Sequence, residues 1–115
     1  MPSVRAIAGH RITAEYARTP AEQQQGLSGR DSLPADTALV FPFPSPQTPT
    51  FWMKDMRFPI DIVWVAGRRV IDISASVPAD DGATRYSPPS PVDEVFELPA
   101  GWCVVHDVAV GDRVE

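Results

Sequence analysis

The stretch that decides the fold is FWMKDMRFPIDIVWV, at residues 51–65. Two apolar runs surround a charged group that includes Lys54, the only lysine in the protein. After Pro59, β-branched and aromatic residues predict a strand at residues 60–65. A lysine and an aspartate (Asp61) beside apolar positions lower stability unless they are paired or used for binding. The charged residues of this stretch therefore either stabilise the fold or form a binding site.

The residues after this strand predict a hairpin. Gly67 and Arg68 form a tight turn. Residues 60–65 and 69–74 on either side are therefore expected to pair as antiparallel strands. Alternating prolines after residue 41 predict that an earlier strand ends there in a stiff, extended loop. Further β-prone segments lie at residues 4–7, 12–16, 38–41, 50–53 and 92–98.

One short helix is predicted after Thr19. Thr19 and Glu22 match a capping box, and Pro20 suits the first helical position. Gly26 is placed to end the helix after at most two turns. Residues 102–106 are apolar and could form either one helical turn or a short strand.

The composition bounds the fold and excludes some partners. With 115 residues, the chain has room for a single domain over residues 1–115. Its 13 prolines favour short strands and stiff turns over long helices. The expected fold class is mostly β (α+β), a small partly closed antiparallel β-sheet or barrel with one short helix. A net charge of −5 argues against binding nucleic acid through bulk electrostatics, so no nucleic-acid partner is predicted.

Two further features bear on the compartment. No run approaches the ~18 apolar residues that a membrane span requires, so no membrane insertion is expected. The first residues lack the basic and apolar regions of a signal peptide. The protein is expected to be cytoplasmic if the chain is complete, and periplasmic or extracellular if an export signal was trimmed.

The single cysteine, Cys103, excludes an intrachain disulfide.

Several short motifs follow one another in an order typical of a known family. They are Gly26-Leu27 before Arg30, Phe51-Trp52-Met53-Lys54, Pro59-Ile60-Asp61-Ile62, Tyr86-Ser87-Pro88, Glu97-Leu98-Pro99-Ala100-Gly101 and Gly111-Asp112. On these motifs, the chain from about residue 12 to residue 114 resembles the family known as domain of unknown function 192. The resemblance implies a compact, mostly β domain of bacterial and archaeal proteins, often exported, with no established activity. It supplies no catalytic residues.

The chain departs from the usual pattern of that family at three places. Ser28-Gly29 precedes Arg30, where the family usually has a methionine after Gly-Leu. Thr37-Ala38 replaces a glycine and a methionine before the next strand. Asp55-Met56 replaces the usual Asn-Thr and adds a negative charge beside Lys54, which could alter any ligand preference there.

The candidate site is a polar cluster around the opening stretch. Aromatic residues there offer apolar walls, and the lysine could hold a carboxylate, a phosphate or a sugar hydroxyl. A simpler interpretation is a buried salt-bridge network, in which two cations neutralise two carboxylates. The cluster is expected at the open end of the sheet and comprises Lys54, Asp61, Trp52 and Arg30, with Glu97 and Tyr86 beside them.

Catalysis is the main alternative to binding. If Asp61 and Glu97 faced one pocket, they could serve as the carboxylate pair of a small hydrolytic enzyme. Cys103 and His106 are close in sequence, but no evident group would activate the thiol, so no Cys/His site is predicted. Asp80-Asp81-Gly82 resembles only a fragment of a calcium loop and is interpreted as a solvated turn. No metal and no cofactor are predicted.

The sequence favours a non-catalytic accessory or ligand-binding domain that takes a small polar or anionic ligand. The hydrolytic enzyme is the first alternative. A protein-interaction module that uses the proline-rich loop at residues 86–91 is the second. None of these features predicts the oligomeric state.

Overall fold

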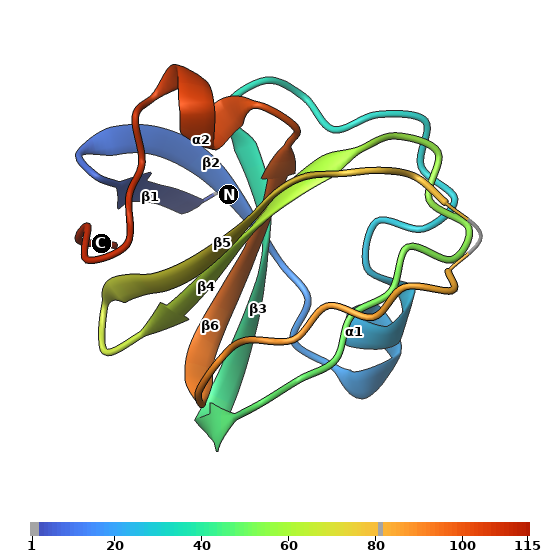
Figure 1. The fold of residues 1–115 in the computed structure, drawn as a ribbon, viewed down its shortest axis with the longest axis horizontal. Coiled ribbons are helices and arrows are strands. Elements are labelled where there is room, and N and C mark those ends of the chain that lie inside the picture. The colour runs from blue at the N-terminus through green and yellow to red at the C-terminus, as the bar shows by residue number, and fades with distance from the viewer. Residues whose placement is uncertain (1–2, 81) are drawn as a thin grey trace.

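The computed structural model describes residues 3–80 and 82–115, which form six strands and two short helices (Figure 1). The strands lie in one sheet, and the prediction of a mostly β fold is confirmed. The helices are α1 (Pro20–Gln25) and α2 (Trp102–Val105). The strands are β1 (Ser3–Ile7), β2 (His10–Tyr16), β3 (Thr37–Gln47), β4 (Ile60–Ala66), β5 (Arg69–Val77) and β6 (Val92–Pro99), in the spatial order β1-β2-β3-β6-β4-β5.

The sheet is mixed and open. β2 and β3 pair in parallel, whereas the other neighbouring strands pair antiparallel. The parallel pair arises because residues 17–36, which include α1, carry the chain back to the starting end of β2. The antiparallel pairing expected throughout therefore does not hold at β2 and β3, and the described strands do not close into a barrel.

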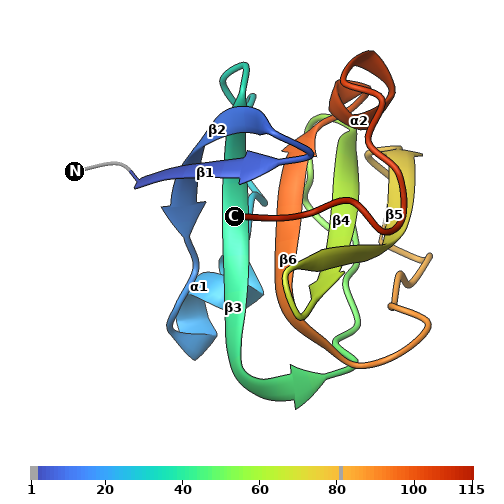
Figure 2. The same ribbon diagram turned by 90° about the vertical axis from the view of Figure 1, so that its left-hand side faces the viewer.

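The two edge strands are linked by the residues that follow α2 (Figure 2). Ala6 on β1 exchanges two backbone hydrogen bonds with Glu115, at 2.9 and 2.8 Å. Val70 on β5 donates a backbone hydrogen bond to Asp112 at 2.9 Å. These contacts give partners to backbone groups that an open edge leaves unpaired.

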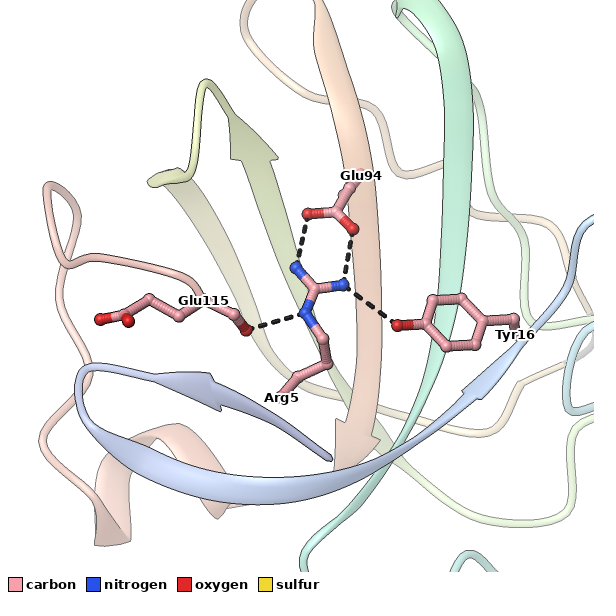
Figure 3. Close-up of polar contacts among 4 residues, drawn as sticks. All are labelled: Arg5, Tyr16, Glu94 and Glu115. Atoms are coloured by element: carbon pink, nitrogen blue, oxygen red, sulfur yellow. Dashed lines mark hydrogen bonds and ion pairs between the residues drawn. The ribbon is translucent and has the colours of Figure 1, made fainter. Parts of the chain in front are cut away.

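Arg5 adds a side-chain link between distant strands of the open sheet, and the sequence did not predict this link (Figure 3). Its guanidinium donates to both carboxylate oxygens of Glu94 on β6, at 2.8 and 2.9 Å. It also donates to the Glu115 carbonyl oxygen at 2.7 Å and to the Tyr16 hydroxyl at 3.4 Å. A bidentate arginine–carboxylate pair is stronger than a single contact and fixes orientation. The pair ties β1 to β6, although β2 and β3 lie between them in the sheet.

Two local predictions are confirmed. β4 and β5 form the expected hairpin, and Gly67 and Arg68 at its turn have positive φ values of 55° and 62°. Helix α1 starts with the expected capping box: the Thr19 hydroxyl accepts from the Glu22 N–H at 3.1 Å, and the Glu22 carboxylate accepts from the Thr19 N–H at 2.9 Å. Gly26 ends the helix.

The prolines after residue 41 do not end β3, which continues to Gln47. The Val40 carbonyl accepts from the Ala17 N–H and so points to the β2 side of the strand. Every second residue after Val40, up to Pro46, is a proline. Because the backbone groups of alternate residues in a strand point to the same side, the nitrogens of these prolines also face the β2 side. Since β2 has ended there, the missing N–H groups remove no ladder hydrogen bond.

The strand predicted at residues 50–53 is wrong. Within this segment, Phe51 makes a single β-bridge with Tyr86. The segment lies against a loop and not against an edge of the sheet, so it has no ladder to join. For residues 102–106 the sequence allowed either a helical turn or a short strand, and the structure has a helix there, α2.

The sheet carries a hydrophobic core on each face. Along β4, Ile62 and Trp64 belong to the core on the α1 side, which the loops around Met53 and Tyr86 cover. Val63 and Val65 belong to the core on the α2 side. Alternate residues of one strand therefore reach opposite faces of the sheet.

Candidate functional site

A cavity of about 680 Å³ opens on the α1 side of the sheet. Its walls are residues 21–28, the later part of β3, and the loop around Trp52. Phe41 and Phe51 contribute aromatic rings to these walls beside the glutamines of α1, and Glu97 on β6 forms the floor. The volume lies within the range of small-ligand sites, which combine apolar walls with a few polar groups.

Glu97 is buried but keeps access to the cavity. It is 6% exposed, and its carboxyl has no hydrogen-bond or ion-pair partner in the described part of the chain. No polar side-chain atom described is both sealed from solvent and unpartnered, so the carboxyl oxygens remain open to the cavity. Gly26 lies beside this carboxyl, and a side-chain carbon on the glycine would come into ordinary contact with the Glu97 Oε1, at 3.9 Å.

Burial raises the pKa of Glu97 to about 8. The carboxyl is therefore protonated at neutral pH and can donate a hydrogen bond. The sequence predicted that cations would neutralise this group, but no cation forms an ion pair with it in the described part of the chain. An uncharged carboxyl at the floor of this cavity is suited to an oxygen acceptor on a ligand.

Trp52 and Lys54 line the edge of the cavity, and Arg85, which is outside the lining, lies against the Trp52 ring; these three side chains are called the rim. The Trp52 indole is 46% exposed. The Lys54 ammonium lies 5.3 Å and the Arg85 guanidinium carbon 4.6 Å from its centre, within the range of cation–π attraction. Sequence reasoning missed Arg85, because nothing in a loop sequence shows which other loop it will meet.

Two loops hold the rim together. Phe51 and Tyr86 exchange backbone hydrogen bonds of 2.8 and 2.9 Å. Gly82 has a φ of 85° and lies against Lys54, where a side-chain carbon on the glycine would come within 2.8 Å of the Lys54 Cβ. The Arg85 guanidinium donates to the Gly82 carbonyl. The absence of a side chain at Gly82 thus allows both cations to reach one indole.

The six residues of the predicted cluster do not meet in one place. Trp52, Lys54 and Glu97 line the cavity, whereas the other three do not. Arg30 forms an ion pair with Glu15 at 3.1 Å. Tyr86 holds the loop through its backbone, and its half-buried side chain packs against the core on the α1 side.

Asp61 lies on the opposite face of the sheet from Glu97. Asp61 is paired with Leu98 on β6, and Glu97 is paired with Ile62 on β4. Since successive residues of a strand point to opposite faces, the two carboxylates point away from each other. The hydrolase hypothesis that used them as one pair is therefore wrong.

Backbone groups satisfy the Asp61 carboxylate. It accepts hydrogen bonds from the N–H groups of Ser76 at 2.8 Å, Gly101 at 3.2 Å and Cys103 at 3.0 Å. Two of these donors lie at the start of α2, which has no side-chain cap on its own residues. The prediction that Lys54 neutralises Asp61 is wrong, because Asp61 serves to hold α2 on the sheet.

Cys103 and His106 both lie in environments that serve packing. Burial, together with nearby Asp61, raises the pKa of Cys103 to about 12, so the thiol stays protonated. The His106 ring stacks on Trp102 with 4.2 Å between ring centres. This environment supplies none of the activation that a nucleophilic cysteine needs.

The turn at Asp80 is described in part. Its carboxylate accepts from the Gly82 N–H at 2.7 Å, while Asp81 lies outside the described residues. Among the residues that are described, no group of three or more His, Cys, Asp or Glu side chains is suited to hold a metal ion. The helices seen in this part of the chain are too short to cross a membrane.

The fold and the cavity define a small, mostly β domain with a cavity of mixed polar and aromatic lining on one face of an open sheet. The chain belongs to the family named domain of unknown function 192 (DUF192), described as "Uncharacterized ACR", whose model matches residues 3–115. The family resemblance drawn from the motifs is confirmed. No curated protein matches the chain.

Two solved structures are similar to this chain over nearly its whole length. One is a protein of unknown function from Novosphingobium aromaticivorans DSM 12444, with 32% sequence identity and a TM-score of 0.91 over 99% of this chain and 84% of that one. The other comes from Sinorhizobium meliloti 1021 and is provisionally described as a transcription regulator. It has 29% identity and a TM-score of 0.88 over 97% of this chain and 92% of that one.

Proposed function

We propose that this protein is a non-catalytic domain that binds a small ligand in the cavity on the α1 side of the sheet. Glu97 carries the proposal. A buried carboxyl group without a hydrogen-bond partner lowers stability, because it has left water and gained nothing in exchange. A ligand oxygen at the cavity floor would supply the missing hydrogen bond.

Binding fits the geometry better than catalysis does. General acid–base chemistry needs a second group placed against the same reacting atom. The other carboxylate that lines the cavity is Asp55, which is exposed on the loop beside Lys54. Binding requires only features already present, namely walls that combine aromatic rings with polar side chains, an open floor and a polar rim.

Chemical-shift mapping by NMR tests the proposal. Amide shifts are followed while a library of metabolite-sized compounds, neutral and charged, is added in mixtures. We expect at least one compound to give saturable shifts at Gly26, Phe51 and Glu97 and to be recovered unchanged.

Two exposed positions supply a matched pair of variants. Gln24→Trp places a large side chain on the wall of the cavity and should abolish the shifts, whereas Thr13→Trp, on the solvent side of β2, should leave them intact. The proposal fails if no compound perturbs the cavity residues, or if Gln24→Trp has no effect on the shifts.

A further inference from the structure

The rim holds two cations, Lys54 and Arg85, in a protein whose net charge is −5. Lys54 and Arg85 both lie over the Trp52 indole, and neither forms an ion pair with an acid in the described part of the chain. Acids near these cations include Asp55, which follows Lys54 in sequence, and Asp80, whose carboxylate accepts from the N–H of Gly82 beside Lys54. A cation over an aromatic ring keeps its charge, and it can still attract an anion.

The interior behind the rim combines aromatic rings with glutamine side chains. The Phe41 and Phe51 rings meet edge to face, with 4.9 Å between their centres, and Phe43 also lines the cavity. Burying these rings against the apolar part of a ligand is favourable. Burying them against a fully hydrated ion, such as free phosphate, is not, because the ion would have to lose water. A ligand that satisfies both the rim and the walls is therefore amphipathic.

The floor favours an anionic ligand for a separate reason. A charged carboxylate there would repel a second anion, because a buried site screens charges less than water does. Because the Glu97 carboxyl is protonated at neutral pH, it donates a hydrogen bond and exerts no such repulsion. Among the described residues, the ionisable side chains that line the cavity are Lys54, Asp55 and Glu97, while α1 and β3 contribute glutamines and aromatic rings.

We propose that the cavity takes a small amphipathic organic anion, with its anionic group held by Lys54 and Arg85 and an acceptor group hydrogen-bonded to the Glu97 carboxyl. This inference rests on the proposed function and names the class of its ligand. Carboxylates, sulfonates and phosphate monoesters share the required chemistry. Neutral apolar molecules and bare inorganic anions each satisfy only one half of the site.

Two fluorescent probes that differ in one charged group test the proposal. Anilinonaphthalene sulfonate (ANS) is an amphipathic anion, and N-phenylnaphthylamine (NPN) has the same aromatic body without the charge. We expect one ANS molecule to bind per chain and NPN to bind more weakly. Lys54→Gln and Arg85→Gln should each weaken ANS about three- to tenfold and leave NPN unchanged, because each removes one charge interaction at the rim.

The control variant is Arg11→Gln, which removes an exposed cation on β2 that does not line the cavity and should leave the affinity for ANS unchanged. Added salt should weaken ANS but not NPN. ANS affinity should also fall as the pH rises through about 8 in the native protein, and this fall should be absent in Glu97→Gln, which carries no proton to lose. Far-UV circular dichroism of every variant checks that the fold is intact.

The outcomes separate this inference from the proposed function. If NPN binds as tightly as ANS and the rim variants change neither, the cavity binds ligands without selecting anions, and only the present inference is overturned. If ANS still binds Gln24→Trp as tightly as the native protein, it binds outside the cavity, which also contradicts the inference. If neither probe binds the native protein, the inference fails, and the NMR library decides the proposed function independently.

Discussion

Glu97 and Asp61 lie one residue pair apart on neighbouring strands, yet the structure treats their charges in opposite ways. On folding, the Asp61 carboxylate loses its hydrogen bonds to water and accepts three from backbone N–H groups instead. Glu97 gives up water and finds no partner among the described residues, so it retains its proton. At the scale of single residues, one carboxyl group therefore supports the fold and the other is left to the cavity.

The pH dependence of stability should report the Glu97 proton. The pKa of Glu97 is raised from 4.5 to about 8 by folding, so between these values the folded protein binds more protons than the unfolded chain. The free energy of unfolding should therefore fall as pH rises through this window, by on the order of 4 kcal/mol in total. Urea denaturation at pH 5, 7 and 9 measures this change. Glu97→Gln should flatten the profile and be more stable than the native protein at pH 9; equal slopes for the two proteins would contradict the account.

Asp61→Asn should destabilise the protein without touching the cavity. The amide nitrogen of asparagine cannot accept a hydrogen bond, so at least one buried backbone N–H loses its partner. We expect a loss of about 3 kcal/mol in the free energy of unfolding, since hydrogen bonds to a buried charged group are among the stronger ones. Asp72→Asn on β5 is the control and should change stability by less than about 0.5 kcal/mol. A loss as small as that of the control would show that Asp61 does not hold α2.

At the scale of elements, the rim depends on the contact between two loops. The loop that carries Trp52 and Lys54 and the loop that carries Arg85 are joined by the Phe51–Tyr86 hydrogen bonds and by the close approach of Gly82. Neither loop belongs to the sheet. Their relative position decides whether the two cations face one ring, so the rim should be sensitive to changes at Gly82.

Gly82→Ala tests that contact. Its new side-chain carbon would meet the Lys54 Cβ at 2.8 Å and force the loops apart. We expect a loss of roughly 1 to 3 kcal/mol in stability and weaker ANS binding. Gly9→Ala is a matched control, because Gly9 has a similar φ of 82° and nothing within 4 Å of the added carbon. If both variants lose the same stability and bind ANS equally, backbone strain explains the effect and the loop contact does not.

The sequence predicted elements well where their causes are local. The capping box at Thr19 and the turn at Gly67 act within a few residues, and both are found as expected. Strand parity is also local, but whether Asp61 and Glu97 share a face depends on the pairing of β4 with β6, which a single sequence does not reveal. The same holds for Arg85, whose place at the rim depends on contact between distant loops. Trp52, Lys54 and Glu97 were predicted from residue type and do line one cavity.

At the scale of the whole molecule, the open sheet is held in a curled shape by contacts between its distant strands. Residues 111–115 bond to both edges, and Arg5 spans from β1 to Glu94 on β6. The Arg5 and Glu94 side chains are only 18% and 20% exposed, so water screens their pair weakly. This pair should contribute more to stability than an ordinary surface ion pair.

A double-mutant cycle on Arg5→Met and Glu94→Gln measures that contribution. We expect a coupling energy of about 1 to 3 kcal/mol, because the pair is bidentate and largely removed from water. The comparison cycle uses Arg57 and Asp31, whose side chains are 61% and 87% exposed and whose coupling should lie near 0 to 0.5 kcal/mol. Equal coupling in the two cycles would contradict the role of Arg5 in holding the curled sheet.

The most direct test of the account is a titration of the Glu97 carboxyl carbon by NMR, with and without ANS. The account predicts a midpoint near pH 8 in the free protein and a higher one with saturating ANS, because a ligand that prefers the protonated form must raise its pKa. A midpoint near the ordinary glutamate value of 4.5 would show that the cavity floor is charged at neutral pH, and it would contradict the account.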